Sequence, residues 1–438
     1  MSGQRKMHLM AFLLAGPTCH HHGMWRHPET ENAFLDPAAW EHIARVLEQG
    51  RFDSVFFADI LAFYDSFGGK YDTILGRGGQ MGLLDPIPLL TVMARVTRHI
   101  GLGATISTSF FNHFHIARTL GTLDVISGGR AAWNIVTSAN PQEAHNFGMT
   151  GLPGKDERYD RAEEMLLACL QLWNSWADDA FVLDKKVGVF TDPSKVREIN
   201  FKGNWISSRG PNTVPRSPQG HPVIMQAGSS ERGRAFCAKH AEIVFTLQHS
   251  KADMQEFYKE MKERVRAEGR DPDELVILPS LDPIIGETDA IARERQSYMN
   301  ALVDPTLALA LVSGHLGIDF SKYPLDARID DLDLDVAVKG SFDVLAQGAR
   351  AEGLTLGQAA QRFGISELTP QVVGAPATVA DYLIDLFDDR ACDGFIITPT
   401  VLPGTFEQFV RAVVPELQAR GKFRTEYPGT TLRGNLRG

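Results

Sequence analysis

Two serines at the start of a predicted helix could hold a phosphate group. The apolar strand Val223–Gln226 leads through Gly228 into Ser229 and Ser230, which open a helix predicted over residues 230–240. Free N–H groups and the positive end of the helix dipole make such a helix start suitable for an anion. Serine is also a common N-cap residue, and on this segment alone capping is the favoured role.

Lys155 and Tyr159 could reach the same anion. They lie one turn apart at the start of a helix predicted over residues 156–176, so both side chains can reach one point. A phosphate between Lys155, Tyr159 and Ser229 is chemically reasonable. A solvated first turn, with Tyr159 packed on a neighbouring segment, explains the same residues equally well.

Further polar residues stand where predicted strands end. Asp59 follows SVFFA, Thr105 follows IGLGA, and Asn134, Thr137 and Ser138 belong to WNIVTS. Such side chains could hydrogen-bond a planar polar ring, although Asp and Thr are also ordinary turn residues. Asn134 interrupts an otherwise apolar strand, and a buried amide must find hydrogen-bond partners.

The run Cys19, His20, His21 and His22 invites a metal interpretation. Adjacent histidines on a loop rarely share one ion, and no carboxylate stands beside them in ligand spacing. We therefore predict no metal site and expect these histidines near the mouth of an active site. His315 is a lone histidine and on its own would be interpreted as structural.

Composition and charge exclude several classes of function. Forty-four basic and 54 acidic residues give a net charge of −10 without a Lys/Arg run, so nucleic-acid binding is not expected. No apolar stretch approaches the roughly 20 residues that span a membrane. The four cysteines lack CxxC spacing, which favours a reducing cytoplasm. A GxGxxG fingerprint after a strand and a P-loop are both missing, so no NAD(P)H site is predicted.

Short apolar strands alternate with amphipathic helices along the chain, which is the pattern of a parallel sheet covered on both faces. Strands are predicted over residues 8–13, 54–58, 100–105, 131–135, 223–226, 243–246, 276–281 and 394–398. Helices are predicted over residues 36–50, 113–127, 156–176, 230–240, 252–268, 378–389 and 406–420. Thr378 with Asp381 predicts a capping box at the start of the sixth of these helices.

Eight such units predict a (β/α)₈ TIM barrel with its active site at the carboxyl ends of the strands. The segments 177–221 and 283–375 exceed what these units need. Neither is flanked by a flexible linker, so we expect one barrel domain over residues 1–438 with two insertions.

Several motifs together resemble the bacterial-luciferase-like FMN-dependent monooxygenases, in the branch of nitrilotriacetate monooxygenase component A and dibenzothiophene-sulfone monooxygenase. The resemblance covers nearly the whole chain. It is carried by MHLMAF, GMWRHPE, RFDSVFFAD, IGLGATIST, SGGRAAWNIVTS, DERYDRAEE, VPRSPQGHPVIMQAGSS, DGFIITPTVLPG and FRTEYPGTTLR.

The resemblance implies an FMN pocket, with the helix start as the phosphate site. Its residues in this chain would be Asp59, Thr105, Tyr159 and Ser229, with Asn134 and Ser230 nearby and Thr137 and Ser138 on the floor of the pocket. Many relatives have a histidine where this chain has Lys155, which can still pair with phosphate as a point charge.

The implied activity is oxidation of a small organic substrate by O₂ and reduced FMN, which a separate NAD(P)H:flavin reductase supplies. His20 and His315, with His22 behind them, would donate a proton or stabilise the reactive oxygen species. Phe12, Phe56 and Phe245 could form an apolar wall for an aromatic substrate, and they could equally be barrel core. Relatives of this kind are commonly homodimers or homotetramers.

Other functions remain open on the same barrel. One is an F420- or flavin-dependent reductase that transfers hydride, and another is a flavin-binding protein without catalysis. A metal-dependent hydrolase is disfavoured, because a strand-end His-x-His with carboxylate ligands is not evident. The substrate could be a sulfone, another heteroatom compound or an aromatic compound.

Overall fold

The computed structural model describes residues 5–17, 19–228, 230–328 and 352–438. Eight parallel strands in this part of the chain close into a barrel, in the order β1-β2-β3-β4-β9-β10-β11-β13 and back to β1. They are β1 (His8–Leu14), β2 (Ser54–Ala58), β3 (Gly101–Ser107), β4 (Ala131–Val136), β9 (Val223–Gln226), β10 (Ile243–Thr246), β11 (Val276–Ile285) and β13 (Gly394–Ile397). The predicted TIM barrel and its eight strands are confirmed.

Strand side chains alternate between two apolar layers, as the period of two requires. In β1, Leu9 and Leu13 pack with the surrounding helices, whereas Met10, Phe12 and Leu14 pack inside the barrel. The strands are therefore buried on both faces, which explains their nearly continuous apolar sequence.

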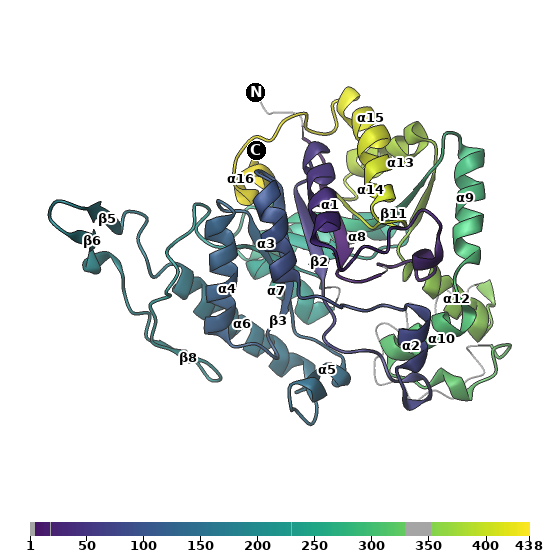
Figure 1. Ribbon diagram of the computed structural model, residues 1–438, viewed down its shortest axis with the longest axis horizontal. Coiled ribbons are helices and arrows are strands. Elements are labelled where there is room, and N and C mark those ends of the chain that lie inside the picture. Colours follow the sequence, from purple (N-terminus) through teal and green to yellow (C-terminus); the bar gives the residue numbers. More distant parts are fainter. Residues whose placement is uncertain (1–4, 18, 229, 329–351) are drawn as a thin grey trace.

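Helices surround the barrel (Figure 1), and six of the seven named next agree with predicted segments to within a few residues, whereas the helix Pro86–Val96 was not predicted. They are α1 (Pro37–Gln49), α3 (Pro86–Val96), α4 (His113–Ile126), α6 (Lys155–Trp173), α7 (Glu231–His240), α8 (Lys251–Ala267) and α13 (Pro376–Asp388). Asp36, Asp85 and Asn112 cap α1, α3 and α4 by accepting hydrogen bonds from backbone N–H groups two residues on. These caps fix where each helix begins.

Two details of the prediction are wrong. The capping box at Thr378 does not form, because α13 already begins at Pro376 and the Thr378 hydroxyl donates to Asp289 instead, at 2.8 Å. The last helix is not continuous but consists of α14 (Gly404–Gln408), a π-helical turn (Phe409–Val413) and α15 (Val414–Ala419). Pro415 lacks the N–H that a regular helix needs there, so the preceding turn widens.

The segment 177–221 forms two small hairpins, β5 (Phe181–Asp184) with β6 (Val189–Thr191) and β7 (Phe201–Lys202) with β8 (Ser207–Ser208). Figure 1 shows β5 and β6 standing away from the barrel. The segment 283–375 contains α9 (Asp289–Ala301), α10 (Pro305–Leu316), α12 (Leu356–Ser366) and β12 (Gln371–Gly374), which extends the sheet beside the end of β11.

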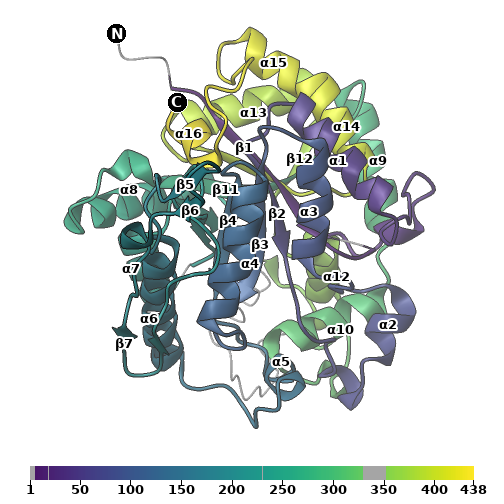
Figure 2. The same ribbon diagram turned by 60° about the vertical axis from the view of Figure 1, so that its left-hand side comes forward.

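The two ends of the barrel differ. Helices α10 and α12 pack with α2 (Asp72–Arg77) in an apolar cluster of their own, and Figure 2 shows them at the opposite end of the barrel from the helix α16 (Leu432–Arg437) and the chain termini. Leu432 and Leu436 of α16 complete the barrel interior at its amino end. None of the described helices is long and apolar enough to cross a membrane.

Candidate active site

Thr105 and Asn134 form a buried polar pair on neighbouring strands. They are register partners near the carboxyl ends of β3 and β4. The Thr105 hydroxyl donates to the Phe57 carbonyl at 2.8 Å, and the Asn134 amide donates to Thr105 Oγ1 at 2.9 Å. Asn134 Oδ1 is buried and has no hydrogen-bond partner among the described residues. Because an unpaired buried acceptor is costly, this oxygen is suited to an N–H donor of a bound ligand.

Ser138 and Thr137 continue this polar region past the end of β4. Ser138 has a left-handed backbone (φ 53°) and its hydroxyl donates to Ser107 Oγ at 2.9 Å. Thr137 contributes its carbonyl, which accepts from Ser109 Oγ at 2.7 Å. The structure therefore brings Ser138 close to the end of β3, whereas Thr137 contributes a backbone group to this region.

Asp59 lies at the end of β2 and is half-buried. Its Oδ1 accepts the Ile60 N–H at 3.0 Å. Burial raises the pKa of Asp59 to about 7, and the negative charges of Asp85 and Glu143 add to this effect. Asp59 can therefore change its protonation state near neutral pH.

Glu143 is a residue that the motifs did not reveal. It is buried at the start of the short helix α5 (Pro141–Asn146) and accepts the Leu61 N–H at 3.1 Å. This bond ties the loop after β2 to the loop after β4. A glutamate three residues past an Asn N-cap looks like a surface helix start, so no sequence signal pointed to its burial.

The predicted phosphate residues are partly brought together. Tyr159 is buried and its hydroxyl accepts a hydrogen bond from Gln226 Nε2 at 3.4 Å. Ser230 caps α7 through the Gly233 N–H at 3.2 Å, as the capping alternative required. A Cβ on Gly233 would lie 3.0 Å from the Tyr159 hydroxyl, so only glycine leaves space beside that hydroxyl. Ser229 lies outside the described residues.

Lys155 is exposed at the start of α6, whereas Arg158 is the half-buried cation beside Tyr159. Arg158 Nη1 donates to the Pro153 carbonyl at 2.6 Å. Its Nε is buried and has no hydrogen-bond partner in the described part of the chain. Arg158 was missed because an arginine in the first turn of a charged helix usually faces solvent.

Three histidines from two distant segments converge on one carboxylate. His22 Nε2 lies 2.7 Å from Glu367 Oε1, and the Nε2 atoms of His20 and His315 each lie 3.9 Å from Glu367 Oε2. His20 Nδ1 also contacts Thr369 Oγ1 at 3.0 Å. The structure thus brings His20, His22 and His315 together, and it adds Glu367, which their sequence spacing could not reveal.

Burial lowers the pKa values of all three imidazoles, that of His22 to about 3. The charge of Glu367 opposes this effect at His20 and His315. Neutral imidazoles can donate at one nitrogen and accept at the other. Within the described ranges, no group of three His, Cys, Asp or Glu side chains is arranged to hold a metal ion.

A loop between β2 and α3 joins the histidines to Asp59. His315 Nε2 contacts Gln80 Oε1 at 2.9 Å, and a Cβ on Gly82 would lie 2.9 Å from Asp59 Oδ1. Residues 80–82 therefore lie between His315 and Asp59, and only this short segment separates the two side chains.

Phe12, Phe56 and Phe245 meet inside the barrel. Their ring centroids lie 5.5 to 6.4 Å apart, and the ring of Phe12 lies 4.3 Å from that of His20. Phe12 and Phe56 are buried in the barrel interior, whereas Phe245 is partly exposed. These rings are thus part of the core, and Phe12 also contacts His20.

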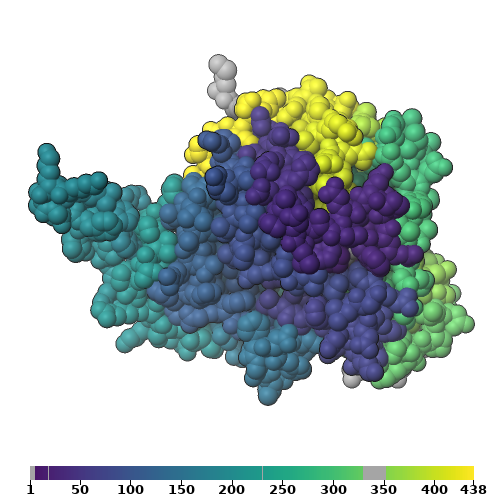
Figure 3. Space-filling model, in the orientation of Figure 1, coloured from purple at the N-terminus to yellow at the C-terminus, as the bar shows by residue number. Residues whose placement is uncertain are grey.

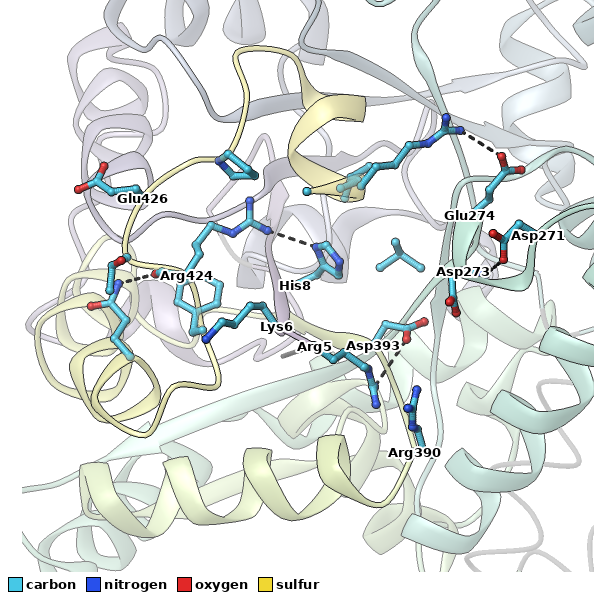
Figure 4. A pocket seen from close by; sticks show the side chains of 18 of the residues that line it. Arg5, Lys6, His8, Asp271, Asp273, Glu274, Arg390, Asp393, Arg424 and Glu426 are labelled. Carbon is cyan, nitrogen blue, oxygen red and sulfur yellow. Dashed lines mark hydrogen bonds and ion pairs between the residues drawn. The ribbon is translucent and has the colours of Figure 1, made fainter. Parts of the chain in front are cut away.

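A large open pocket lies at the other end of the barrel, lined by charged side chains that include His8, Lys262, Asp393 and Arg424 (Figure 4). Lys262 pairs with Asp393 at 2.9 Å, and Arg424 pairs with the buried Asp53. The charges of this pocket thus largely satisfy one another. The amino ends of TIM-barrel strands usually serve stability rather than catalysis.

Comparisons with known proteins agree with this geometry. A family model described as luciferase-like monooxygenase matches residues 10–392. Dibenzothiophene-sulfone monooxygenase of Rhodococcus erythropolis (strain XP) is 48% identical, covering 100% of this chain and 97% of that protein. Nitrilotriacetate monooxygenase component A of Aminobacter aminovorans is 38% identical, with 100% and 97% covered.

A crystal structure of riboflavin lyase with modified FMN and riboflavin superimposes with a TM-score of 0.89 at 30% identity, covering 99% of this chain and 96% of that one. The family model spans well over half of the chain, and the relatives match it from end to end. The chain therefore belongs to the luciferase-like monooxygenase family and is an enzyme of that class.

Proposed function

We propose that this protein is the oxygenase component of a two-component monooxygenase that uses reduced FMN and O₂. The observation that carries the proposal is the unpaired, buried Asn134 Oδ1, held by Thr105 among other strand-end polar groups. An N–H edge of a flavin ring would supply the missing donor. The riboflavin lyase relative, which was crystallised with modified FMN, supports this choice of cofactor.

The described residues fit FMN at both of its ends. Asn134, Thr105 and Asp59 would bind the polar edge of the ring. Tyr159, Ser230 and Arg158 would hold the phosphate, with Ser229 and Lys155 as the further candidates from the sequence. Arg158 Nε, which has no hydrogen-bond partner among the described residues, is a donor available to an anion. Reduced FMN bound in this way would supply the electrons that activate O₂.

The substrate would lie between the aromatic rings and the histidines. Phe12, Phe56 and Phe245 would exclude water and contact an apolar or aromatic molecule, and an aromatic sulfone is the substrate class that we favour because of the relative at 48% identity. His20 and His315 would each hold a proton at Nε2 and hydrogen-bond a bound group with it, because burial keeps both rings neutral.

A separate flavin reductase would deliver the reduced FMN, since the sequence has neither a GxGxxG fingerprint after a strand nor a P-loop. The name of the relative "component A" agrees with an enzyme of two components. We further propose that the two insertions belong to one barrel domain and that the chain forms a homodimer or homotetramer.

The test is an assay with FMN, NADH and a generic flavin reductase, in which dibenzothiophene sulfone and nitrilotriacetate are compared as substrates. We expect a product that carries one oxygen atom from isotopically labelled O₂, and the sulfone to be preferred. An exposed-site variant, Asn200→Ala, is the control and should retain full activity. Product formation without O₂ would refute the proposal and favour a hydride-transferring reductase on the same barrel.

A further inference from the structure

The hairpin of β5 and β6 exposes apolar side chains on both of its faces. All four residues of β5 are exposed. We call this hairpin the arm, and its exposed apolar residues are Phe181, Val182, Leu183, Val187, Val189 and Phe190. Figure 3 shows the arm projecting from the body of the molecule.

The arm has little support within its own chain. It is a two-stranded sheet without a third strand among the described residues, and such hairpins are only marginally stable in water. The described ring contacts that hold it are those of Phe181 with Trp176 at 5.5 Å and with Phe190 at 5.6 Å. The tip residue Val187 is 75% exposed.

We propose that the arm packs on a second copy of this chain. Its six apolar side chains expose on the order of 500 Å², and two arms that each cover an equal area on the partner would bury roughly 2,000 Å² in total. That is the size of a stable interface. A second copy of the chain is always present in equal amount, so it can cover an arm that is apolar on both faces.

The test compares the mass in solution of wild type with that of the variant Val187→Ser/Phe190→Ser, by light scattering over a range of concentrations. Leu35→Ser is the matched control, because Leu35 is 68% exposed and lies outside the arm. We expect wild type and the control to be dimers or larger. The arm variant should dissociate at about tenfold higher concentration.

Far-ultraviolet circular dichroism should show that the arm variant keeps its helices. A wild type that is monomeric at every concentration would overturn the proposal. So would an arm variant with the same mass and dissociation constant as wild type. Neither outcome depends on the proposed oxygenase activity.

Glu367 supports a second, independent inference. It ends α12 with a left-handed backbone (φ 47°, ψ 40°) and is only 8% exposed. Glycine is the usual residue in this conformation, which costs other residues about 1 kcal/mol. The position of a buried glutamate here is explained by its side chain, which reaches His22 at 2.7 Å and lies 3.9 Å from His20 and His315.

We infer that Glu367 is a positioning residue for the proposed oxygenase reaction. Its carboxylate accepts the Nε2 proton of His22, which fixes the tautomer of that ring. Thr369, two residues later, holds Nδ1 of His20. The segment 367–369 therefore sets the orientation of the imidazoles while Glu367 itself acts only through them. This inference rests on the proposed function.

The test is Glu367→Gln, which keeps the side-chain volume, with Glu416→Gln, at a partly exposed residue far from the histidines in sequence, as control. Nitrogen-15 NMR of the resting protein should report a changed tautomer distribution at His22 in Glu367→Gln alone. We expect kcat to fall about tenfold or more while KM and FMN affinity stay within about twofold. Unchanged histidine spectra, or a loss confined to KM, would overturn the inference.

The two possible failures can be told apart. The histidine spectra are recorded without substrate or O₂, so they test the positioning role even if wild type shows no oxygenation. An inactive wild type with altered spectra in Glu367→Gln would count against the proposed function alone.

Discussion

Replacing Arg424 with methionine should destabilise the whole barrel. Arg424 pairs with Asp53, which is completely buried between β1 and β2 and also contacts His8 Nδ1 and the Leu9 N–H, at 2.9 and 2.8 Å. Figure 4 shows Arg424 directed toward His8. Removal of one partner of a buried ion pair leaves a charge without compensation, which costs about 3 to 5 kcal/mol.

We expect Arg424→Met to cost about 3 kcal/mol, the lower end of that range, because two hydrogen bonds to Asp53 remain. The measurement is urea unfolding followed by tryptophan fluorescence. Lys422→Met is the matched control, since the Lys422–Asp388 pair lies nearby but is partly exposed. That control should lose less than about 1 kcal/mol.

The effect should also depend on pH. Burial alone raises the pKa of Asp53, but Arg424 and His8 outweigh burial and hold the pKa below its ordinary value. A lowered folded-state pKa means that the stability is fully present above the unfolded-state pKa and is lost as pH falls. The cost of Arg424→Met should therefore shrink as the pH is lowered toward about 4.

A double variant provides the sharpest control. In Asp53→Asn/Arg424→Met no unpaired buried charge remains, so its cost should be smaller than the sum of the two single costs. The reasoning would be refuted if Arg424→Met cost less than about 1 kcal/mol at neutral pH, or if the double variant showed simple additivity.

Four further outcomes are expected. Asn134→Ala should weaken FMN binding about tenfold in fluorescence titrations, and unchanged affinity would place the ring elsewhere. By calorimetry, Arg158→Ala should reduce the preference for FMN over riboflavin more than Lys155→Ala does; the reverse order would assign the phosphate to the lysine. Phe245→Ala should raise KM for an aromatic sulfone more than it lowers kcat. An unaltered KM would mean that Phe245 packs in the core and does not contact the substrate. The folded-state pKa of Asp59 is about 7, above its unfolded value, so the stability that the protonated carboxyl contributes is lost as the pH rises. In urea unfolding, Asp59→Asn should therefore stabilise the protein more at about pH 8 than at about pH 5. An equal effect at the two pH values would contradict this.

The sequence by itself determined the architecture of this protein. Strand positions could be predicted because each strand is buried on both faces and is therefore a continuous apolar run, as in Val223–Gln226. The helix starts at Asp36 and Asn112 follow equally from local hydrogen bonds to the next turn. Even the polar residues at the strand ends, such as Thr105 and Asn134, could be selected, because a TIM barrel places all strand ends on one face.

Only the tertiary structure decided which of these residues meet. Glu367 contacts His22 across 345 residues of chain, and no local pattern distinguishes it from a surface glutamate. In the folded protein Lys155 is exposed whereas Arg158 is half-buried, because helix packing decides which side of the first turn is buried. The capping box at Thr378 was wrong for the same reason, since Asp289 from another helix engages its hydroxyl. Local sequence fixes local hydrogen bonds and apolar periodicity, whereas the partners of a buried polar group depend on packing between distant segments.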